Sequence, residues 1–226
     1  QEERAKLKSG QRALNNKINE MVQNKGENMS KVLLIKNEKN QKAIGMENRK
    51  TREIEPIYLG RCEYIKSENW ENKYIEFEFE DLKKEKLLKY HYLNTNSIVH
   101  LASPTLQDFF NKYAPNDVQF IPVTIITKDN KKVTDYAMIN ILTEIDGHDK
   151  EYTEYNYIDY FDDGNKVING INKIKYLNDA MGEHLIGRDK FSLSCIVFSE
   201  KFRDLLKLEK IKLKDYKYYL PEEWYS

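Results

Sequence analysis

Short apolar runs, each about the length of a β-strand, follow one another along most of this 226-residue chain. Residues 32–35 are apolar without interruption, and apolar residues alternate with glutamates over residues 75–80, which is typical of a half-buried strand. We interpret the apolar runs at 57–59 and 62–65 as further strands and residues 81–90 as a short helix. The pattern therefore predicts a strand-rich chain with few helices.

Two stretches of the chain share one plan, and their serines Ser103 and Ser199 lie 96 positions apart. Each stretch predicts a strand, a serine at a helix N-cap, an apolar helical face and a returning strand, over residues 98–123 and 195–220. Pro104 supports the first N-cap, because proline is favoured at the first helical position. The similarity indicates either a divergent internal duplication or a common supersecondary unit used twice.

These elements predict an α+β fold with a mixed, mostly antiparallel sheet flanked by the helices of two similar strand–helix–strand units. Between the two units, residues 123–127 and 136–142 are predicted to pair as a hairpin around a turn at Asp129 and Asn130.

The domain organisation follows from where the apolar pattern begins. Residues 1–28 are predicted to be an N-terminal helical extension, either a partner-binding or oligomerising appendage, a segment foreign to the domain, or a peripheral helix packed on it. Residues 29–226 are predicted to form one α+β domain, with possible halves at 29–143 and 144–226.

Composition narrows the function classes. The chain carries 37 basic and 37 acidic residues, and this neutrality argues against a general nucleic-acid binder. No apolar run approaches the roughly 18 residues of a membrane span, and no secretory signal is recognisable, so we expect a cytoplasmic protein without membrane contact. The only two cysteines, Cys62 and Cys195, are far apart, and we interpret Cys195 as a small buried hydrophobe.

Catalytic and metal-binding motifs are missing. The sequence has no glycine-rich phosphate loop, zinc-protease helix or nucleophile elbow, and its four histidines have no metal-ligand spacing. His148 stands alone beside carboxylates, and we interpret it as a solvated loop residue. The aspartates before Gly164 do not match the ligand spacing of a calcium loop. We therefore predict no enzymatic activity, no cofactor and no bound metal.

One window, residues 144–163, holds eight carboxylates and a single lysine, together with several tyrosines. Clustered carboxylates steer a basic partner and tyrosines supply rigid contact area, so we predict a protein-binding surface here, with an ordinary solvated loop as the alternative. The candidate partner-binding residues are Asp146, Asp149, Glu151, Tyr152, Glu154, Tyr155, Asp159, Asp162 and Asp163.

A resemblance to a known family rests on several stretches in order. They are the strand and helix of residues 98–113, the run from Asp117 to Val123, the run from Tyr136 to Leu142, and the run from Ile196 to Leu206. In these stretches the chain resembles immunity-protein family eleven of bacterial polymorphic toxin systems, while residues 31–96 match only in general strand character.

The resemblance implies a cytoplasmic, non-enzymatic antidote that binds the catalytic domain of a cognate toxin, commonly a nuclease, and occludes its active site. It supplies no catalytic residues, and it strengthens the hypothesis that the acidic window is a toxin-binding surface, with a solvated loop still the alternative. The alternative is a nucleic-acid-binding or structural interaction module without a toxin partner.

Overall fold

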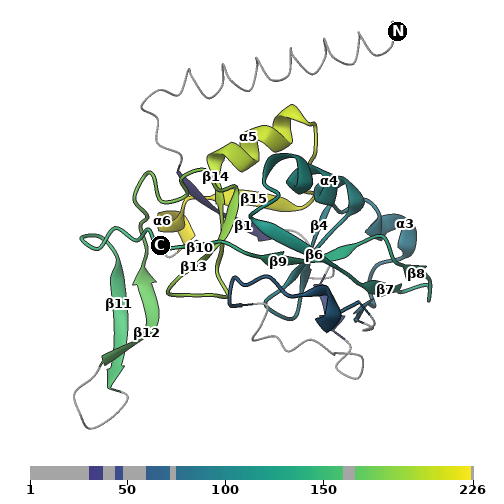
Figure 1. The fold of residues 1–226 in the computed structure, drawn as a ribbon, viewed down its shortest axis with the longest axis horizontal. Coiled ribbons are helices and arrows are strands. Elements are labelled where there is room, and N and C mark those ends of the chain that lie inside the picture. The colour runs from purple at the N-terminus through teal and green to yellow at the C-terminus, as the bar shows by residue number, and fades with distance from the viewer. Residues whose placement is uncertain (1–30, 38–43, 48–59, 72–74, 160–165, 225–226) are drawn as a thin grey trace, which may run out of the picture.

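The computed structural model describes residues 31–37, 44–47, 60–71, 75–159 and 166–224, whose strands form two large sheets and a projecting hairpin (Figure 1). The predicted N-terminal helix and the predicted strand at 57–59 lie outside these residues. The predicted α+β class is confirmed, because the strands form mixed sheets, mostly antiparallel, with a few helices beside them.

The larger sheet has eight strands. From one edge to the other they are β6 (Val118–Pro122), β9 (Ala137–Ile141), β5 (His100–Ala102), β4 (Tyr92–Thr95), β2 (Ile44–Glu47), β3 (Glu76–Phe79), β7 (Thr124–Thr127) and β8 (Lys132–Val133). Neighbours are antiparallel except the pairs β2–β4 and β3–β7. Strand β3 alternates as predicted, with Phe77 and Phe79 fully buried.

The smaller sheet has five strands. In spatial order they are β10 (Glu144–Ile145), β13 (Ile186–Asp189), β14 (Ile196–Ser199), β1 (Val32–Asn37) and β15 (Tyr216–Tyr219), and the pair β10–β13 is parallel. Strands β11 (Glu154–Asp159) and β12 (Lys166–Lys173) pair with each other as an antiparallel hairpin. The helices are α3 (Lys84–Leu87), α4 (Pro104–Tyr113), α5 (Glu200–Leu208) and α6 (Pro221–Trp224), with a 3₁₀ turn η2 (Ser67–Asn69).

The two predicted strand–helix–strand units have the same topology. Helix α4 connects β5 to β6, and β9 lies between these strands, antiparallel to both. Helix α5 connects β14 to β15, and β1 takes the place of β9. A backbone hydrogen bond is repeated as well: the N–H of Ser103 donates to the carbonyl of His91, and that of Ser199 to the carbonyl of Leu185. The two middle strands differ in their place along the chain: β9 follows the first unit, whereas β1 precedes the second.

Both long helices begin at the serine N-caps predicted from the sequence. The Oγ of Ser103 accepts from the N–H of Leu106 at 3.4 Å, and the Oγ of Ser199 accepts from the N–H of Phe202 at 3.2 Å. Both serines are buried, so water cannot replace the lost acceptor easily.

We expect Ser199→Ala to lower the free energy of unfolding by about 1 kcal/mol, because the N–H of Phe202 loses its acceptor. Denaturant unfolding measures this change. Ser67→Ala, at an exposed serine, is the control and should leave stability unchanged. Equal stability of the two variants would show that the cap contributes nothing.

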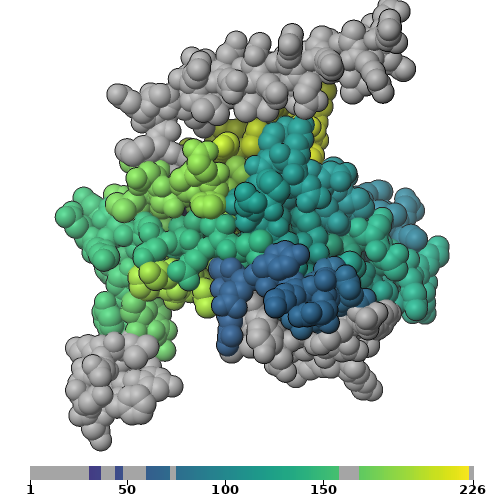
Figure 2. Space-filling model, in the orientation of Figure 1, coloured from purple at the N-terminus to yellow at the C-terminus, as the bar shows by residue number. Residues whose placement is uncertain are grey.

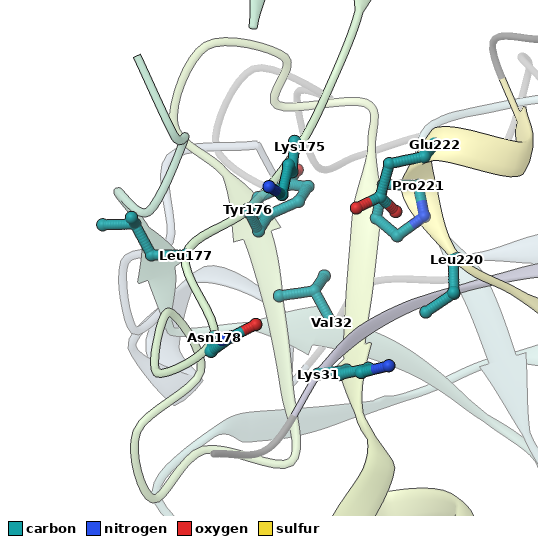
Figure 3. A pocket seen from close by; sticks show the side chains of 9 residues that line it. All are labelled: Lys31, Val32, Lys175, Tyr176, Leu177, Asn178, Leu220, Pro221 and Glu222. Atoms are coloured by element: carbon teal, nitrogen blue, oxygen red, sulfur yellow. The ribbon is translucent and has the colours of Figure 1, made fainter. Parts of the chain in front are cut away.

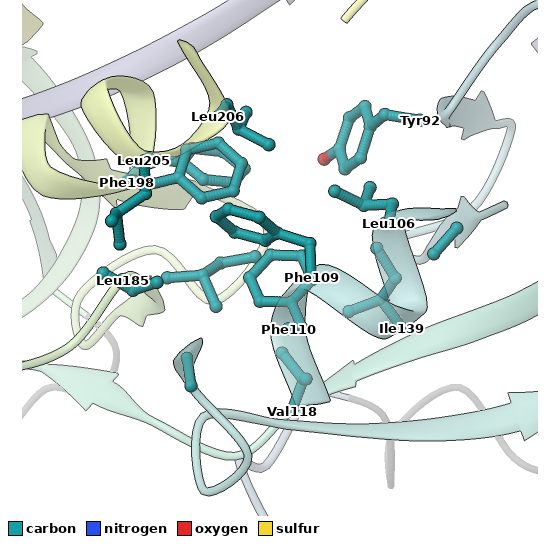
Figure 4. Packing of buried hydrophobic residues seen from close by; sticks show 14 of the residues in the cluster. Tyr92, Leu106, Phe109, Phe110, Val118, Ile139, Leu185, Phe198, Leu205 and Leu206 are labelled. Atoms are coloured by element: carbon teal, nitrogen blue, oxygen red, sulfur yellow. The ribbon is translucent and has the colours of Figure 1, made fainter. Parts of the chain in front are cut away.

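Helices α4 and α5 pack on each other through phenylalanine rings (Figure 4). The ring of Phe202 lies 5.7 Å from that of Phe109 and stacks on Phe110 at 5.6 Å. Aliphatic side chains from both units surround these rings: Leu33, Leu106, Val118, Ile139, Leu185, Leu205 and Leu206. The two units therefore share one core.

The predicted hairpin of residues 123–127 with 136–142 is wrong. Strand β7 instead turns back into β8, and residues 136–142 supply β9. All five residues of β9 are buried, so both faces of this strand are covered. The apolar pattern showed this burial but not which strands would be the neighbours.

The run at 62–65 is not a strand. Cys62 has a backbone φ of +57°, which places it in a turn. Ile65 is nevertheless buried, and the side-chain amide of Gln119 satisfies its backbone: the N–H of Ile65 donates to Oε1 at 3.0 Å and its carbonyl accepts from Nε2 at 2.6 Å. The side chain of Gln119 thus makes the hydrogen bonds that a neighbouring strand would otherwise make with Ile65.

Candidate functional site

The described part of the acidic window, residues 144–159, lies at the base and along the first strand of the hairpin β11–β12, which stands out from the body of the molecule (Figures 1 and 2). The chain leaves the smaller sheet after β10, and a β-bridge between His148 and Tyr176 closes the base of the hairpin. The ladder has irregularities after Glu154 and after Asn156, and such bulges increase the local twist of a strand.

A buried hydrogen-bond network anchors this base. His148 is 4% exposed, and its Nε2 lies 2.5 Å from Oδ2 of the fully buried Asp189. The hydroxyl of Tyr176 donates to the same carboxylate oxygen. The other oxygen accepts from the backbone N–H groups of Phe191 and Ser192, each at 2.8 Å. The interpretation of His148 as a solvated residue is therefore wrong.

The network reaches the hairpin through Tyr155, whose hydroxyl lies 2.7 Å from Nδ1 of His148. Burial, and then the negative charge of Asp189, raise the pKa of Tyr155, so the phenol keeps its proton at neutral pH. Nε2 of His148 donates to the carboxylate of Asp189, whose oxygens only accept. These polar groups satisfy one another, which fits an anchor for β11.

Three carboxylates of the acidic window are paired with lysines that follow it in the chain. The pairs are Asp146 with Lys190 at 2.6 Å, Asp149 with Lys175 at 3.7 Å and Glu154 with Lys173 at 3.8 Å. The hydrogen bond from Lys190 lowers the pKa of Asp146. These lysines offset part of the negative charge, so the surface around the window is less negative than the sequence of residues 144–163 suggests.

Three aromatic rings share one side of the hairpin base, and we call Tyr155, Tyr157 and Phe191 the aromatic patch. The ring centroid of Tyr155 lies 6.2 Å from that of Tyr157 and 5.6 Å from that of Phe191. Tyr157 is 54% exposed and Phe191 36% exposed, so solvent reaches large apolar area here. Exposed aromatic groups held in place by a buried network are suited to protein contact.

The amides of Asn156 and Asn172 mark a second, polar surface of the hairpin. Each amide nitrogen donates to the oxygen of the other, at 2.6 and 2.7 Å. Both residues are exposed and contribute no aromatic area. The hairpin therefore carries exposed aromatic and exposed amide groups on the same two strands.

A cavity of about 180 Å³ lies beside the hairpin base, between the start of β1, the chain that follows β12, and α6 (Figure 3). Its charged lining groups are Lys31, Lys175 and Glu222, and Tyr176 connects it to the buried network. Lys175 also lies over the ring of the exposed Tyr152, with Nζ 3.8 Å from the ring centroid.

The family model described as "Immunity protein family (Imm11)" matches residues 12–218. The chain belongs to this family. The match confirms the resemblance and extends it to residues 31–96, where the sequence alone shows only general strand character, and to residues 12–28, for which sequence reasoning found no counterpart in the family. No curated relative matches the chain at a significant level.

Membership of the Imm11 family indicates a toxin-neutralising role and a protein partner. The family is generally non-enzymatic. Within the ranges that the structure describes, no helix has the length and apolar character of a membrane span. Those ranges also contain no group of three or more His, Cys, Asp or Glu that could hold a metal.

The structure of this Imm11 protein brings part of the predicted site together. Asp146, Asp149, Glu151, Tyr152, Glu154 and Tyr155 lie at the hairpin base, and Asp159 ends β11. Asp162 and Asp163 lie outside the described residues.

Sequence reasoning missed Phe191, Tyr176 and Asp189, which come from later segments of the chain. The one local sequence signal for Phe191 is that it and Leu193 are apolar residues placed just before a predicted strand. In the structure both side chains are more than a third exposed.

Proposed function

We propose that this Imm11 protein neutralises a cognate toxin, with a nuclease-type effector as the expected target, by placing the hairpin β11–β12 across the toxin's active-site cleft. Family membership supports the role, and the observation that supports the surface is the projecting hairpin with its exposed aromatic patch. A protruding ribbon of two strands is a shape that fits a cleft, and binding there excludes substrate sterically.

The aromatic patch is the proposed energetic centre of the contact. Binding energy concentrates in buried aromatic anchors, whereas exposed ion pairs contribute little. Tyr157 and Phe191 offer such anchors, and the bond from Tyr155 to His148 restricts the motion of the strand that carries Tyr157. Less ordering entropy is then lost on binding.

The proposed role of the carboxylates is to steer the toxin. Changing Asp159, Asp162 and Asp163 together to lysine is expected to slow association about tenfold at low salt, with a smaller effect at high salt, because screening weakens long-range attraction. Stopped-flow binding at several salt concentrations measures this. The charge-matched control changes the exposed Glu68, Glu71 and Asp81 to lysine. Unchanged association of the first variant would show that the window is only solvated.

The whole function is tested with the toxin encoded beside this protein. Co-expression is expected to rescue cells poisoned by the toxin, and the purified proteins are expected to form a stable complex that inhibits the toxin. Absence of both rescue and complex would overturn the proposal. Log-linear, salt-dependent binding to nucleic acid instead would favour a nucleic-acid-binding module.

A further inference from the structure

The strands of the projecting hairpin pair with each other and with no other strand that the structure describes. Among the described residues, no backbone hydrogen bond outside the hairpin ladder involves residues 154–159 or 166–173. The outer edge of each strand therefore presents N–H and C=O groups that an additional strand can pair with. In Figure 1, β11 lies on the side of the hairpin that faces away from the body of the molecule, and β12 on the side that faces it.

Both irregularities of the hairpin ladder belong to β12. From Glu154 to Tyr155 the partner on β12 moves by two positions instead of one, which leaves Asn172 as an extra residue. The second irregularity skips one residue of β12 in the same way, at Asn169. Bulges protect a sheet edge, because they break the regular spacing of its N–H and C=O groups. Strand β11 has no extra residue and is therefore the regular edge of the hairpin.

The edges of the two large sheets offer less room for an additional strand. Strands β8 and β10 have two residues each, and β6 ends in Pro122, which has no N–H. Strand β15 has four residues and is followed by α6. Of the described edge strands without an irregularity, β11 is the longest, with six residues. Its alternate residues present about three N–H and three C=O groups outward.

Side-chain hydrogen bonds hold the start of β11 in place. The hydroxyl of Tyr155 lies 2.7 Å from Nδ1 of His148. Just before β11, the hydroxyl of Thr153 accepts from the N–H of Lys175 at 3.3 Å and donates to the carbonyl of the same residue at 3.1 Å. A two-stranded hairpin alone is only marginally stable in water, so these anchors order the edge before a third strand arrives. An added strand would lie beside Tyr155 and Tyr157, which makes the edge continuous with the aromatic patch.

The charges of the hairpin indicate the chemistry of the added strand. Strand β11 contains Glu154 and Asp159 and no basic residue, whereas β12 contains Lys166 and Lys173 and no acidic one. Opposite charges on facing residues of neighbouring strands are favourable, and like charges are unfavourable. Two copies of β11 paired antiparallel about their midpoint would place Glu154 opposite Asp159. A basic strand of another protein therefore fits this edge better than a second copy of this chain.

We propose that an extended segment of the toxin, carrying lysine or arginine, adds to the outer edge of β11 as a third strand of the hairpin. The inference rests on the proposed function and specifies how the toxin is held. Main-chain hydrogen bonds to β11 provide affinity, and the side chains on the two faces provide specificity. Tyr155 and Tyr157 lie on one of these faces and Asn156 on the other, because neighbouring residues of a strand point to opposite sides.

Residue-resolved amide hydrogen exchange of the full chain, free and bound to the purified toxin encoded beside it, tests the proposal. In the free protein every second amide of β11 is expected to exchange fast, because it points away from β12. In the complex these amides should exchange at least about tenfold more slowly, while the outward amides of β12 stay fast. An inhibited complex in which the outward amides of β11 stay fast overturns this inference and leaves the proposed function intact. Slow exchange at high protein concentration without toxin would assign the edge to a second copy and overturn it as well.

Proline variants provide a second test. Asn156 and Tyr157 are consecutive, so one N–H points to β12 and the other points outward, and exchange in the free protein shows which. Proline at the outward position, Asn156→Pro or Tyr157→Pro, removes that donor and is tolerated at a sheet edge. This variant should keep its melting temperature and bind the toxin about tenfold more weakly than the alanine variant of the same residue, which keeps the N–H. Equal affinity of the proline and alanine variants overturns the inference, and if the proline variant does not fold, the exchange pattern of the wild type decides.

Discussion

Asp189→Ala is expected to lower the free energy of unfolding by about 3–5 kcal/mol, the largest loss we anticipate for a single substitution near the candidate site. The carboxylate is fully buried and accepts from His148, from Tyr176 and from the backbone of Phe191 and Ser192. Alanine leaves these donors buried without an acceptor. Denaturant unfolding followed by circular dichroism measures the loss.

Asp189→Asn and Asp146→Ala are the companion variants. Asparagine keeps one oxygen for the two backbone N–H groups but places an amide against His148, so an intermediate loss is expected. Asp146 is an exposed carboxylate paired with Lys190, and its removal should leave stability unchanged. If Asp189→Ala is as stable as Asp146→Ala, the network does not anchor the hairpin.

Tyr157→Ala is expected to weaken toxin binding by about 30-fold or more, because truncating a central aromatic anchor costs about 2 kcal/mol or more. Tyr157 is 54% exposed and its ring contacts only part of the aromatic patch, so the fold should tolerate the change. Calorimetry with the purified toxin measures the affinity, and thermal unfolding verifies the fold.

Tyr64→Ala provides the matched control, since Tyr64 is 66% exposed and lies outside the hairpin. Asn172→Ala, among the exposed amides of β12, separates the two kinds of exposed group on the hairpin. Wild-type affinity of Tyr157→Ala would remove the aromatic patch from the interface. A loss in Asn172→Ala alone would assign the interface to the amide groups.

Local chemistry explains what could be predicted from the pattern of residues. Ser103 and Ser199 cap their helices as expected, because an N-cap is decided by residues within one helical turn. The alternation around Phe77 and Phe79 likewise predicts the buried face of β3, since neighbouring side chains of a strand point to opposite sides. The family resemblance rested on such local stretches too.

Contacts between distant segments explain what could not be predicted. His148 and Asp189 are 41 positions apart, and nothing near His148 in the sequence indicates a buried carboxylate partner. In the same way, the aromatic patch needs Phe191 from the loop before β14. Tyr152 and Tyr157 of the acidic window lie at the surface as expected, but Lys173, Lys175 and Lys190 lie beside the window and pair with three of its carboxylates.

The α+β class, the two capped strand–helix–strand units and the position of the acidic, tyrosine-rich window could all be read from the amino-acid sequence, because each depends on residues close together in the chain. The pairing of distant segments in the fold explains why β9 and β1 complete the two units and why the described part of the window lies on a projecting hairpin. Strand pairing and burial join segments far apart in sequence, and their free energy depends on every partner at once.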